Sequence, residues 1–291
     1  LISASELAAH LGDRDWIVFD CRHDLADPTA GARAYAQSHV RGAVHVSLDG
    51  DLSGTKNGRN GRHPLPDAAA FCTRMAELGL RNDMQVVAYD ATGGAFAARL
   101  WWMLRWVGHE SVAVLDGGWN AWQKAGLPVT AAAAAITPGK FSGSPRDITV
   151  DAAFVAAEIG SPRTRLIDAR SPDRFRGENE TLDPVGGHIP GAINRFFQNN
   201  LGSDGCFKPA EALRTYEAQS AGMIASLLKS GDRLTRLRGL EAQRVRGMSL
   251  LDLARKGEAM EQLTEVLRQY DQLDDAEGQA ETLHVMASLR Y

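Results

Sequence analysis

The chain has 291 residues, of which 44% are hydrophobic and 23% are charged, a balance typical of a globular protein. Its formal net charge of −4 is too small to indicate a nucleic acid or a charged membrane surface as a partner. The cysteines Cys21, Cys72 and Cys206 are few, odd in number and widely spaced, which argues against a disulfide framework or a zinc site. We therefore expect a cytoplasmic protein with no metal, no cofactor, no nucleic-acid partner and no membrane contact.

The first half alternates strand and helix patterns. Predicted strands are WIVFDCR (16–22), VVAY (86–89) and SVAVLDGG (111–118), and predicted helices are PLPDAAAFCTRMAEL (64–78), AARLWWMLRWVG (97–108) and NAWQKAG (120–126). Strands that alternate with helices are typical of an α/β domain with a mostly parallel sheet. We expect the sheet to be doubly wound, with helices on both faces.

The loop between two of these elements has an unusual composition. Residues 86–102 read VVAYDATGGAFAARLWW, a strand, a Gly-Gly turn and a helix. Such a turn points backbone N–H groups inward beside a helix N-terminus and so favours an anion. The residue at its base, Asp90, is itself an anion, and neither a nucleophile nor a lysine follows.

Part of this pattern is repeated. RLIDAR (165–170) matches WIVFDCR (16–22), and GHIPGAINRFF (187–197) matches SHVRGAVHVSL (38–48). Each copy contains a strand that ends in Asp-x-Arg, followed by a His before a Gly-Ala turn. The repeat predicts strands ending at Asp168 and near 192–197, and then a helix over KPAEALRTYEA (208–218). Because both halves carry the Asp and the His, we expect structural roles for these side chains.

The repeat stops after about residue 214. The counterpart of the Gly-Gly loop would fall near residue 239, where the sequence is LTRLRGLEAQR (234–244), without a strand pattern or a cysteine. Residues 215–291 contain no proline and show helical spacing over 250–273, followed by a turn at 274–275 and a second helix. This segment weakly resembles one tetratricopeptide unit, which cannot bury its apolar face alone.

The motifs together resemble the tandem-domain rhodanese family of thiosulfate and 3-mercaptopyruvate sulfurtransferases. VFDCRHDLADPTAG, GRHPLP, the Asp90 loop, VLDGGWNAW, LIDARSPDRFRG and GHIPGAINRFF occur in order, so the resemblance covers residues 1 to about 214. It implies a rhodanese-like domain at 1–130 that is a catalytically silent copy, the N-terminal part of a second such domain at 145–214, and an α-helical segment at 215–291.

The resemblance also implies chemistry. Family members transfer sulfane sulfur from a small anionic donor to a thiophilic acceptor through a cysteine persulfide, using a cysteine loop in the second domain. That loop is absent from this sequence, so we expect the chain to be inactive as written, with Cys206 the least unlikely substitute nucleophile. Asp90, Gly93 and Gly94 correspond to the degenerate active-site loop of the silent copy.

Two arginines are candidates for binding the donor. The resemblance assigns a substrate-binding arginine to Arg174, and Arg176 is the second candidate. The alternative for both is a surface arginine paired with Glu178 or Glu180, and we favour substrate binding for Arg174 and the surface pair for Arg176. Asp183 stands where mercaptopyruvate-using members carry another arginine, which favours thiosulfate weakly.

Two alternatives to an enzyme remain. The chain could be a non-catalytic interaction protein that binds a protein partner, or itself, through residues 215–291. It could also be a rearranged or truncated gene product. In either case a second sheet without its central strand is predicted to expose apolar surface. We expect the helices of residues 240–291 either to dock on that sheet or to mediate association between chains.

Overall fold

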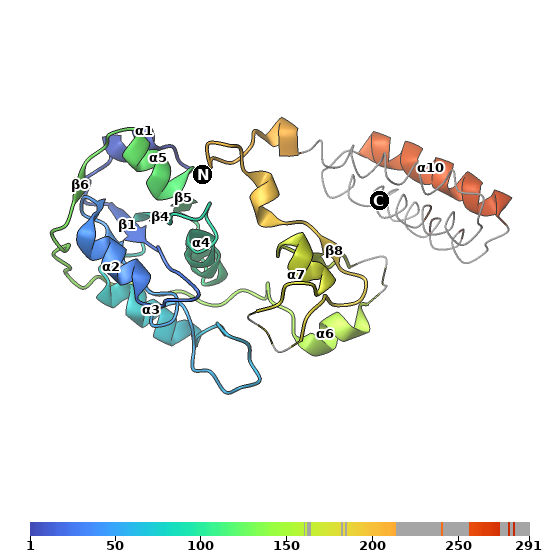
Figure 1. Cartoon of the computed structure of the whole chain (residues 1–291), viewed down its shortest axis with the longest axis horizontal. Coiled ribbons are helices and arrows are strands. Elements are labelled where there is room, and N and C mark those ends of the chain that lie inside the picture. The colour runs from blue at the N-terminus through green and yellow to red at the C-terminus, as the bar shows by residue number, and fades with distance from the viewer. Residues whose placement is uncertain are drawn as a thin grey trace. The chain divides into compact units, whose positions relative to one another are not determined.

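The computed structural model describes residues 1–159, 161, 164–181, 183, 185–213, 240, 256–273, 279 and 282. The chain divides into two compact units, Leu1–Lys208 and Pro209–Tyr291. Figure 1 shows the first unit in blue to yellow-orange and the described helix of the second in red.

The first half of unit 1 is built on a four-stranded parallel sheet in the order β3-β1-β4-β5. Its strands are β1 (Trp16–Asp20), β3 (Val44–His45), β4 (Gln85–Tyr89) and β5 (Val112–Val114). The central strand β4 pairs with β1 over five residues and with β5 over three. This confirms the predicted α/β fold with a parallel sheet.

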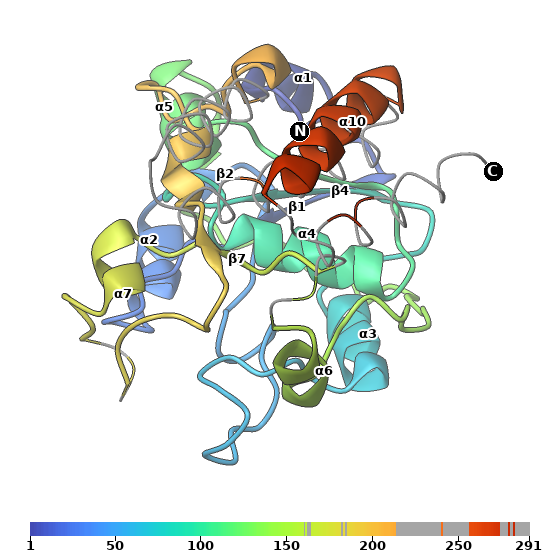
Figure 2. The same cartoon turned by 90° about the vertical axis from the view of Figure 1, so that its right-hand side faces the viewer.

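Each face of the sheet packs against its own apolar core. Side chains of a strand alternate between faces, so Phe19 and Ala88 join one buried cluster while Val18 and Val87 join the other. Helices α3 (Ala68–Glu77) and α4 (Ala97–Trp106) cover the first face. Helices α1 (Ala4–Ala9) and α5 (Gly118–Lys124) cover the second, as Figures 1 and 2 show. The sheet is therefore covered by helices on both sides.

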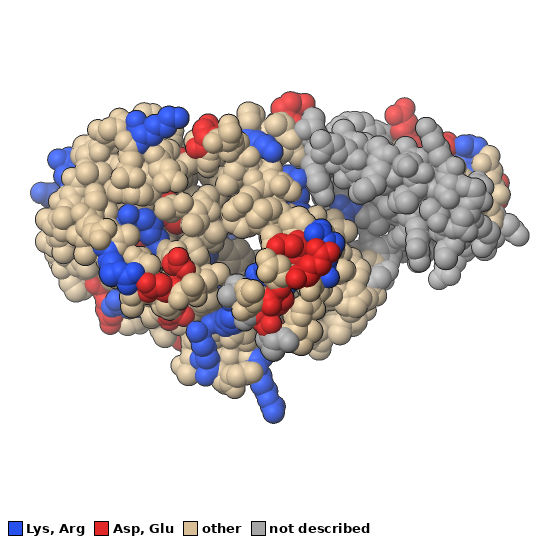
Figure 3. Space-filling view, viewed as in Figure 1, with Lys and Arg blue, Asp and Glu red and all other residues tan. Residues whose placement is uncertain are grey.

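Smaller elements complete this half. Helix α2 (Ala30–Gln37) follows β1, and β2 (His39–Val40) pairs antiparallel with β6 (Val129–Thr130). The loop between β3 and α3 extends away from the rest of the fold at the bottom of Figure 1. Acidic and basic side chains are interspersed on the face drawn in Figure 3.

The second half of unit 1 has less regular structure. It contains α6 (Ala152–Ala157), β7 (Ile167–Asp168), α7 (Pro172–Arg176), β8 (Ile193–Asn194) and the 3-10 helix η1 (Phe197–Asn200). Strands β7 and β8 form a two-stranded parallel sheet. The strand predicted near 192–197 is thus only two residues long, because the chain turns into η1 at Phe197. The helix predicted from residue 208 is described only over residues 210–213.

Unit 2 is described mainly through α10 (Lys256–Gln272), which lies within the helical pattern predicted over 250–273. Val266 and Tyr270 of α10 are buried with Leu240 in a small apolar cluster. The predicted turn at 274–275 and most of the helix after it lie outside the described residues. Among the described helices, none is both long enough and apolar enough to cross a membrane.

Candidate functional site

The Asp90 carboxylate occupies the N–H ring of its own loop. Asp90 follows β4 and is 1% exposed. Its Oδ1 accepts hydrogen bonds from the backbone N–H groups of Thr92 at 2.8 Å and Gly94 at 3.0 Å. Its Oδ2 accepts from the N–H groups of Phe96 at 2.8 Å and Ala97 at 2.9 Å. Four backbone N–H groups beside the start of α4, together with the Thr92 hydroxyl at 3.3 Å, thus satisfy the Asp90 carboxylate.

Glycines give this loop its shape. Gly93 and Gly94 have φ angles of +73° and +88°, a left-handed conformation that favours glycine and lets the loop turn several of its N–H groups toward Asp90. On the other side, a Cβ at Gly118 would lie 2.3 Å from the Asp90 carbonyl oxygen, so only glycine permits this approach. The Gly-Gly pair predicted as an anion cradle therefore forms one, and the protein supplies the anion.

A segment of the second half packs over this loop. The Phe207 N–H donates to Asp116 Oδ1 at 2.7 Å, directly after β5. A Cβ added at Gly94 would lie 3.7 Å from the Phe207 ring, and one added at Gly93 would lie 2.3 Å from Leu201 Cδ1. Leu201 and Phe207 also pair with each other through an isolated bridge. The loop in front of Asp90 is therefore covered by side chains of the same chain.

None of the three thiols lies in such a ring of donors. Burial raises the pKa of Cys21 well above its usual value, with the Asp20 charge adding to the effect. Burial also raises the pKa of Cys72 in α3. Cys206 is half-buried, and desolvation followed by the charges of Asp116 and Asp204 raises its pKa. A raised pKa disfavours the thiolate, which is the nucleophilic form of cysteine.

Arg174 and Arg176 differ in their surroundings. Arg174 contacts Glu180 through its Nε and Nη2 atoms at 2.8–3.0 Å, and its Nη2 also lies 3.0 Å from Asp183 Oδ2. Its side chain is 18% exposed. Arg176 pairs with Glu178 at 2.8 Å, and both side chains are more than half exposed. The structure thus gives each arginine a carboxylate partner.

Both Asp-x-Arg repeats form the same ion pair. Arg22 Nη2 lies 2.6 Å from Asp20 Oδ2, and Arg170 Nη2 lies 2.5 Å from Asp168 Oδ2. His39 follows Ser38, whose carbonyl oxygen accepts a hydrogen bond from Arg22, and the Nδ1 of His39 lies 2.7 Å from the Tyr35 carbonyl oxygen. These side chains hold the backbone after a strand, as expected for structural roles.

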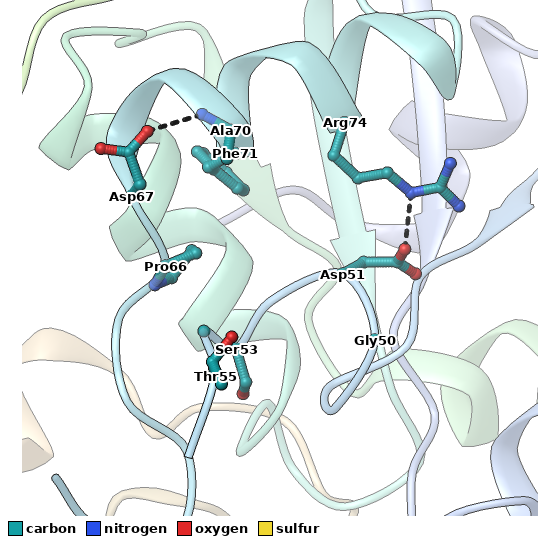
Figure 4. A pocket seen from close by; sticks show the side chains of 10 residues that line it. Gly50, Asp51, Ser53, Thr55, Pro66, Asp67, Ala70, Phe71 and Arg74 are labelled. Atoms are coloured by element: carbon teal, nitrogen blue, oxygen red, sulfur yellow. Dashed lines mark hydrogen bonds and ion pairs between the residues drawn. The ribbon is translucent and has the colours of Figure 1, made fainter. Parts of the chain in front are cut away.

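The charged side chains that line a hollow beside α3 also have structural roles. The hollow has a volume of about 370 Å³ and lies between the β3–α3 loop and the first turns of α3 (Figure 4). The Arg74 guanidinium lies 2.7 Å from Asp51 Oδ1, and Asp67 caps α3 by accepting from the Ala70 N–H at 2.9 Å. Its two carboxylates and its arginine therefore hold the loop to the helix.

One further group of side chains, which the sequence pattern did not indicate, lies at the carboxyl edge of the sheet. His23 follows β1, Asp49 follows β3, and His63 lies in the loop before α3. Their ligand atoms all lie within 4.8 Å of one another. The sequence indicated this group only weakly, because the three residues are far apart along the chain and follow no regular spacing. Only their common position after parallel strands, or in the loop that follows, could have indicated proximity.

Comparisons with known proteins agree with this geometry. The family model described as "Rhodanese-like domain" matches residues 3–125. The chain is 49% identical over 216 residues to a probable 3-mercaptopyruvate sulfurtransferase of Pseudomonas aeruginosa, covering 73% of this chain and 76% of that protein. It is 39% identical over 217 residues to the putative thiosulfate sulfurtransferase SseB of Mycobacterium tuberculosis, covering 71% and 74% of the two chains.

A solved structure gives the same result. The crystal structure of SseA from Escherichia coli, described as showing the rhodanese fold of 3-mercaptopyruvate sulfotransferases, matches with a TM-score of 0.67 and 30% identity. The match covers 75% of this chain and 82% of that one. The weak likeness of residues 215–291 to a tetratricopeptide unit is not borne out by these comparisons. A parallel sheet with a glycine loop after its central strand, together with these relatives, shows that the chain belongs to the rhodanese family of sulfurtransferases.

Proposed function

We propose that this chain keeps a sulfurtransferase scaffold but does not itself transfer sulfane sulfur. The observation that carries the proposal is that none of the three cysteines lies in a ring of backbone donors like the one that holds Asp90 in the first half. The cysteine loop that the family places in its second domain is absent from the sequence. The three cysteines of the sequence all lie elsewhere.

The proposed lack of activity follows from the chemistry of transfer. A thiolate attacks the outer sulfur of a donor such as thiosulfate, the sulfur–sulfur bond of the donor breaks, and sulfite leaves. The resulting persulfide is then attacked by an acceptor such as cyanide, which takes the terminal sulfur and restores the thiolate. Both steps need a cysteine with a low pKa that is held by positive potential. Cys206 has carboxylate neighbours and a raised pKa instead.

Turnover of the full chain with cyanide and either thiosulfate or 3-mercaptopyruvate tests this proposal, with an active family member as the positive control. We expect no turnover above the rate without protein. Robust turnover that disappears in Cys206→Ser would contradict the proposal and make Cys206 the nucleophile. Turnover lost in Cys21→Ser or Cys72→Ser, but kept in Cys206→Ser, would contradict it equally.

For donor binding, we propose Arg174 rather than Arg176 as the contact for a small anion. Its guanidinium is more buried than that of Arg176, which strengthens a charge-assisted hydrogen bond. Asp183 competes for the same Nη2 atom at 3.0 Å. Thiosulfate binding should therefore tighten in Asp183→Ala, weaken in Arg174→Ala and stay unchanged in Arg176→Ala. Equal binding in all three variants would remove Arg174 from the site.

A second function is favoured by exposed apolar side chains. Ile167 and Ile193 of the two-stranded sheet are 55% and 41% exposed, and Phe154 of α6 and Val185 are also exposed. Such surface favours a non-catalytic interaction protein that binds a protein partner or a second copy. We propose residues 215–291 as the segment that mediates this association, in a cytoplasmic protein whose three cysteines stay reduced.

Size-exclusion chromatography with light scattering, combined with limited proteolysis, tests the second function. We expect a dimer or larger species that becomes monomeric, or precipitates, when residues 215–291 are removed. A monomer that loses this segment to protease with no change in solubility would contradict it.

A further inference from the structure

We propose that His23, Asp49 and His63 form a binding site for a divalent transition-metal ion, with Zn²⁺ the best match. The site lies in the first half of unit 1 and is independent of the proposed lack of sulfur transfer. Two imidazoles and one carboxylate are ligands that Zn²⁺ accepts readily, and three protein ligands leave a fourth position for solvent.

The distances between the ligand atoms fit a cation better than hydrogen bonds. His63 Nε2 lies 3.5 Å from Asp49 Oδ1, and His23 Nε2 lies 3.8 Å from Asp49 Oδ2. Hydrogen bonds between such atoms would be about 2.7–3.2 Å long. Ligand atoms around a tetrahedral Zn²⁺ with bonds of about 2.0–2.1 Å are separated by about 3.3 Å. Small side-chain rotations would therefore bring the three atoms to coordinating distance.

The burial of His23 supports a ligand role. Its side chain is 3% exposed, and its Nε2 lies 3.8 Å from Asp49 Oδ2, beyond hydrogen-bond distance. The Phe96 ring contacts the His23 ring edge-on, with centroids 5.2 Å apart, and fixes its orientation. The His63 ring stands at 89° to that of His23, with centroids 6.4 Å apart. A buried imidazole aimed at a carboxylate that it does not bind is explained by a shared ion.

Protonation does not oppose binding near neutral pH. Burial lowers the pKa of His23 and, independently, that of His63, so both rings are held in the neutral form that binds metals. The Asp49 charge acts on both rings in the opposite direction, while the charges of Lys56, Arg62 and Arg99 lower the pKa of His63 further, and His45 lowers that of His23.

Lys56 is the competitor for this site. Its Nζ lies 3.2 Å from Asp49 Oδ1, the same oxygen that faces His63. The Lys56 side chain is 55% exposed, so it can move into solvent when a cation arrives. Removing Lys56 should therefore raise the affinity for the metal, whereas removing either histidine should lower it.

Titration of the metal-free full chain with ZnCl₂ by calorimetry tests the site, with Co²⁺ absorption in the visible range as an independent report on coordination. We expect one Zn²⁺ per chain, an affinity at least tenfold lower in His23→Ala and in His63→Ala, and a severalfold higher affinity in Lys56→Ala. The Co²⁺ spectrum should change in both histidine variants, whose folding is checked by circular dichroism.

His10→Ala is the matched control. His10 also faces an aspartate, Asp13, but its Nδ1 lies at a normal hydrogen-bond distance of 2.8 Å and both side chains are exposed. Its removal should leave Zn²⁺ affinity unchanged, as should Cys206→Ser. Unchanged affinity in folded His23→Ala and His63→Ala would overturn the proposal, and so would binding that is lost in Cys206→Ser.

Discussion

The two Asp-x-Arg motifs have the same local geometry in two different environments. In each, the arginine Nε lies 3.0 Å from both carboxylate oxygens of the aspartate two residues earlier. In each, the arginine Nη2 also donates to a carbonyl just before the repeated His, that of Ser38 at 2.7 Å or of Gly187 at 2.6 Å. The motif therefore folds through its own hydrogen bonds in both halves.

Burial separates the two motifs. The Asp20 side chain is fully buried, whereas that of Asp168 is 13% exposed and that of Arg170 is 29% exposed. In the first half, Tyr89 of β4 donates its hydroxyl to Asp20 Oδ2 at 2.7 Å. In the described part of the second half, β7 pairs only with β8. The hydrogen bonds within the motif therefore set its local geometry. The neighbouring central strand buries the ion pair and so determines how much the pair contributes to stability.

The largest expected effect on stability is at the Asp90 loop, which has no counterpart in the described residues of the second half. Asp90→Ala would leave four backbone N–H groups without their acceptor, one buried and three partly buried. The cost is about 1–3 kcal/mol for each group that solvent cannot reach. We expect the free energy of unfolding to fall by about 4 kcal/mol, measured by urea denaturation. Asp13→Ala, on an exposed pair, is the control and should cost less than about 0.5 kcal/mol. A cost below 1 kcal/mol for Asp90→Ala would mean that the ring is not formed.

The next effect tests the motifs directly. Asp20→Asn removes the charge from a fully buried ion pair and should cost about 3 kcal/mol, because the Arg22 guanidinium is left without its counter-charge. Asp168→Asn changes the same local pair where solvent reaches it, and should cost about 1 kcal/mol or less. Denaturation of both variants measures the difference. Equal losses would show that burial does not separate the two motifs.

Smaller effects are expected for the two arginines of α7. Arg174→Ala should cost about 1–2 kcal/mol, because Glu180, whose side chain is 5% exposed, loses a charge-assisted partner. Arg176→Ala breaks an exposed pair with Glu178 and should cost between 0 and about 0.5 kcal/mol. Proteolysis rates of the second half compare the two variants, and the reverse order would contradict the assignment of Arg174 as the more buried partner.

The smallest effect is a difference in pH response. His109 is buried in the first half, its Nε2 has no hydrogen-bond partner within the described structure, and desolvation lowers its pKa. The neutral ring therefore stabilises the fold above the unfolded pKa of about 6.5, and this contribution is lost as pH falls through the lower folded pKa. The denaturation midpoint should drop between pH 7.5 and 5.5, and less so in His109→Gln.

In the second half, Asp168 makes stability depend on pH in a more acidic range. Its hydrogen bonds with Arg170, mainly through the side chain, lower its pKa, so its contribution is present above the unfolded pKa of about 3.9 and is lost below it. Hydrogen exchange near β7 should therefore stay unchanged from pH 7.5 to 5.5 after correction for the intrinsic rate. A change near β7 in that interval would contradict the assignment of the two pH ranges.

From the sequence we could predict the strand and helix order of the first half, the repeat at Asp168 and the anion-binding shape of the Asp90 loop. These depend on hydrophobic periodicity, glycine positions and hydrogen bonds between residues close in sequence, all of which can be recognised along the chain. The three-dimensional fold was needed to see that Asp20 is fully buried while Asp168 is partly exposed, that Arg174 faces two carboxylates, and that His23, Asp49 and His63 converge. These depend on which loops meet at the carboxyl edge of the sheet, and that is set by strand order and packing rather than by spacing along the chain.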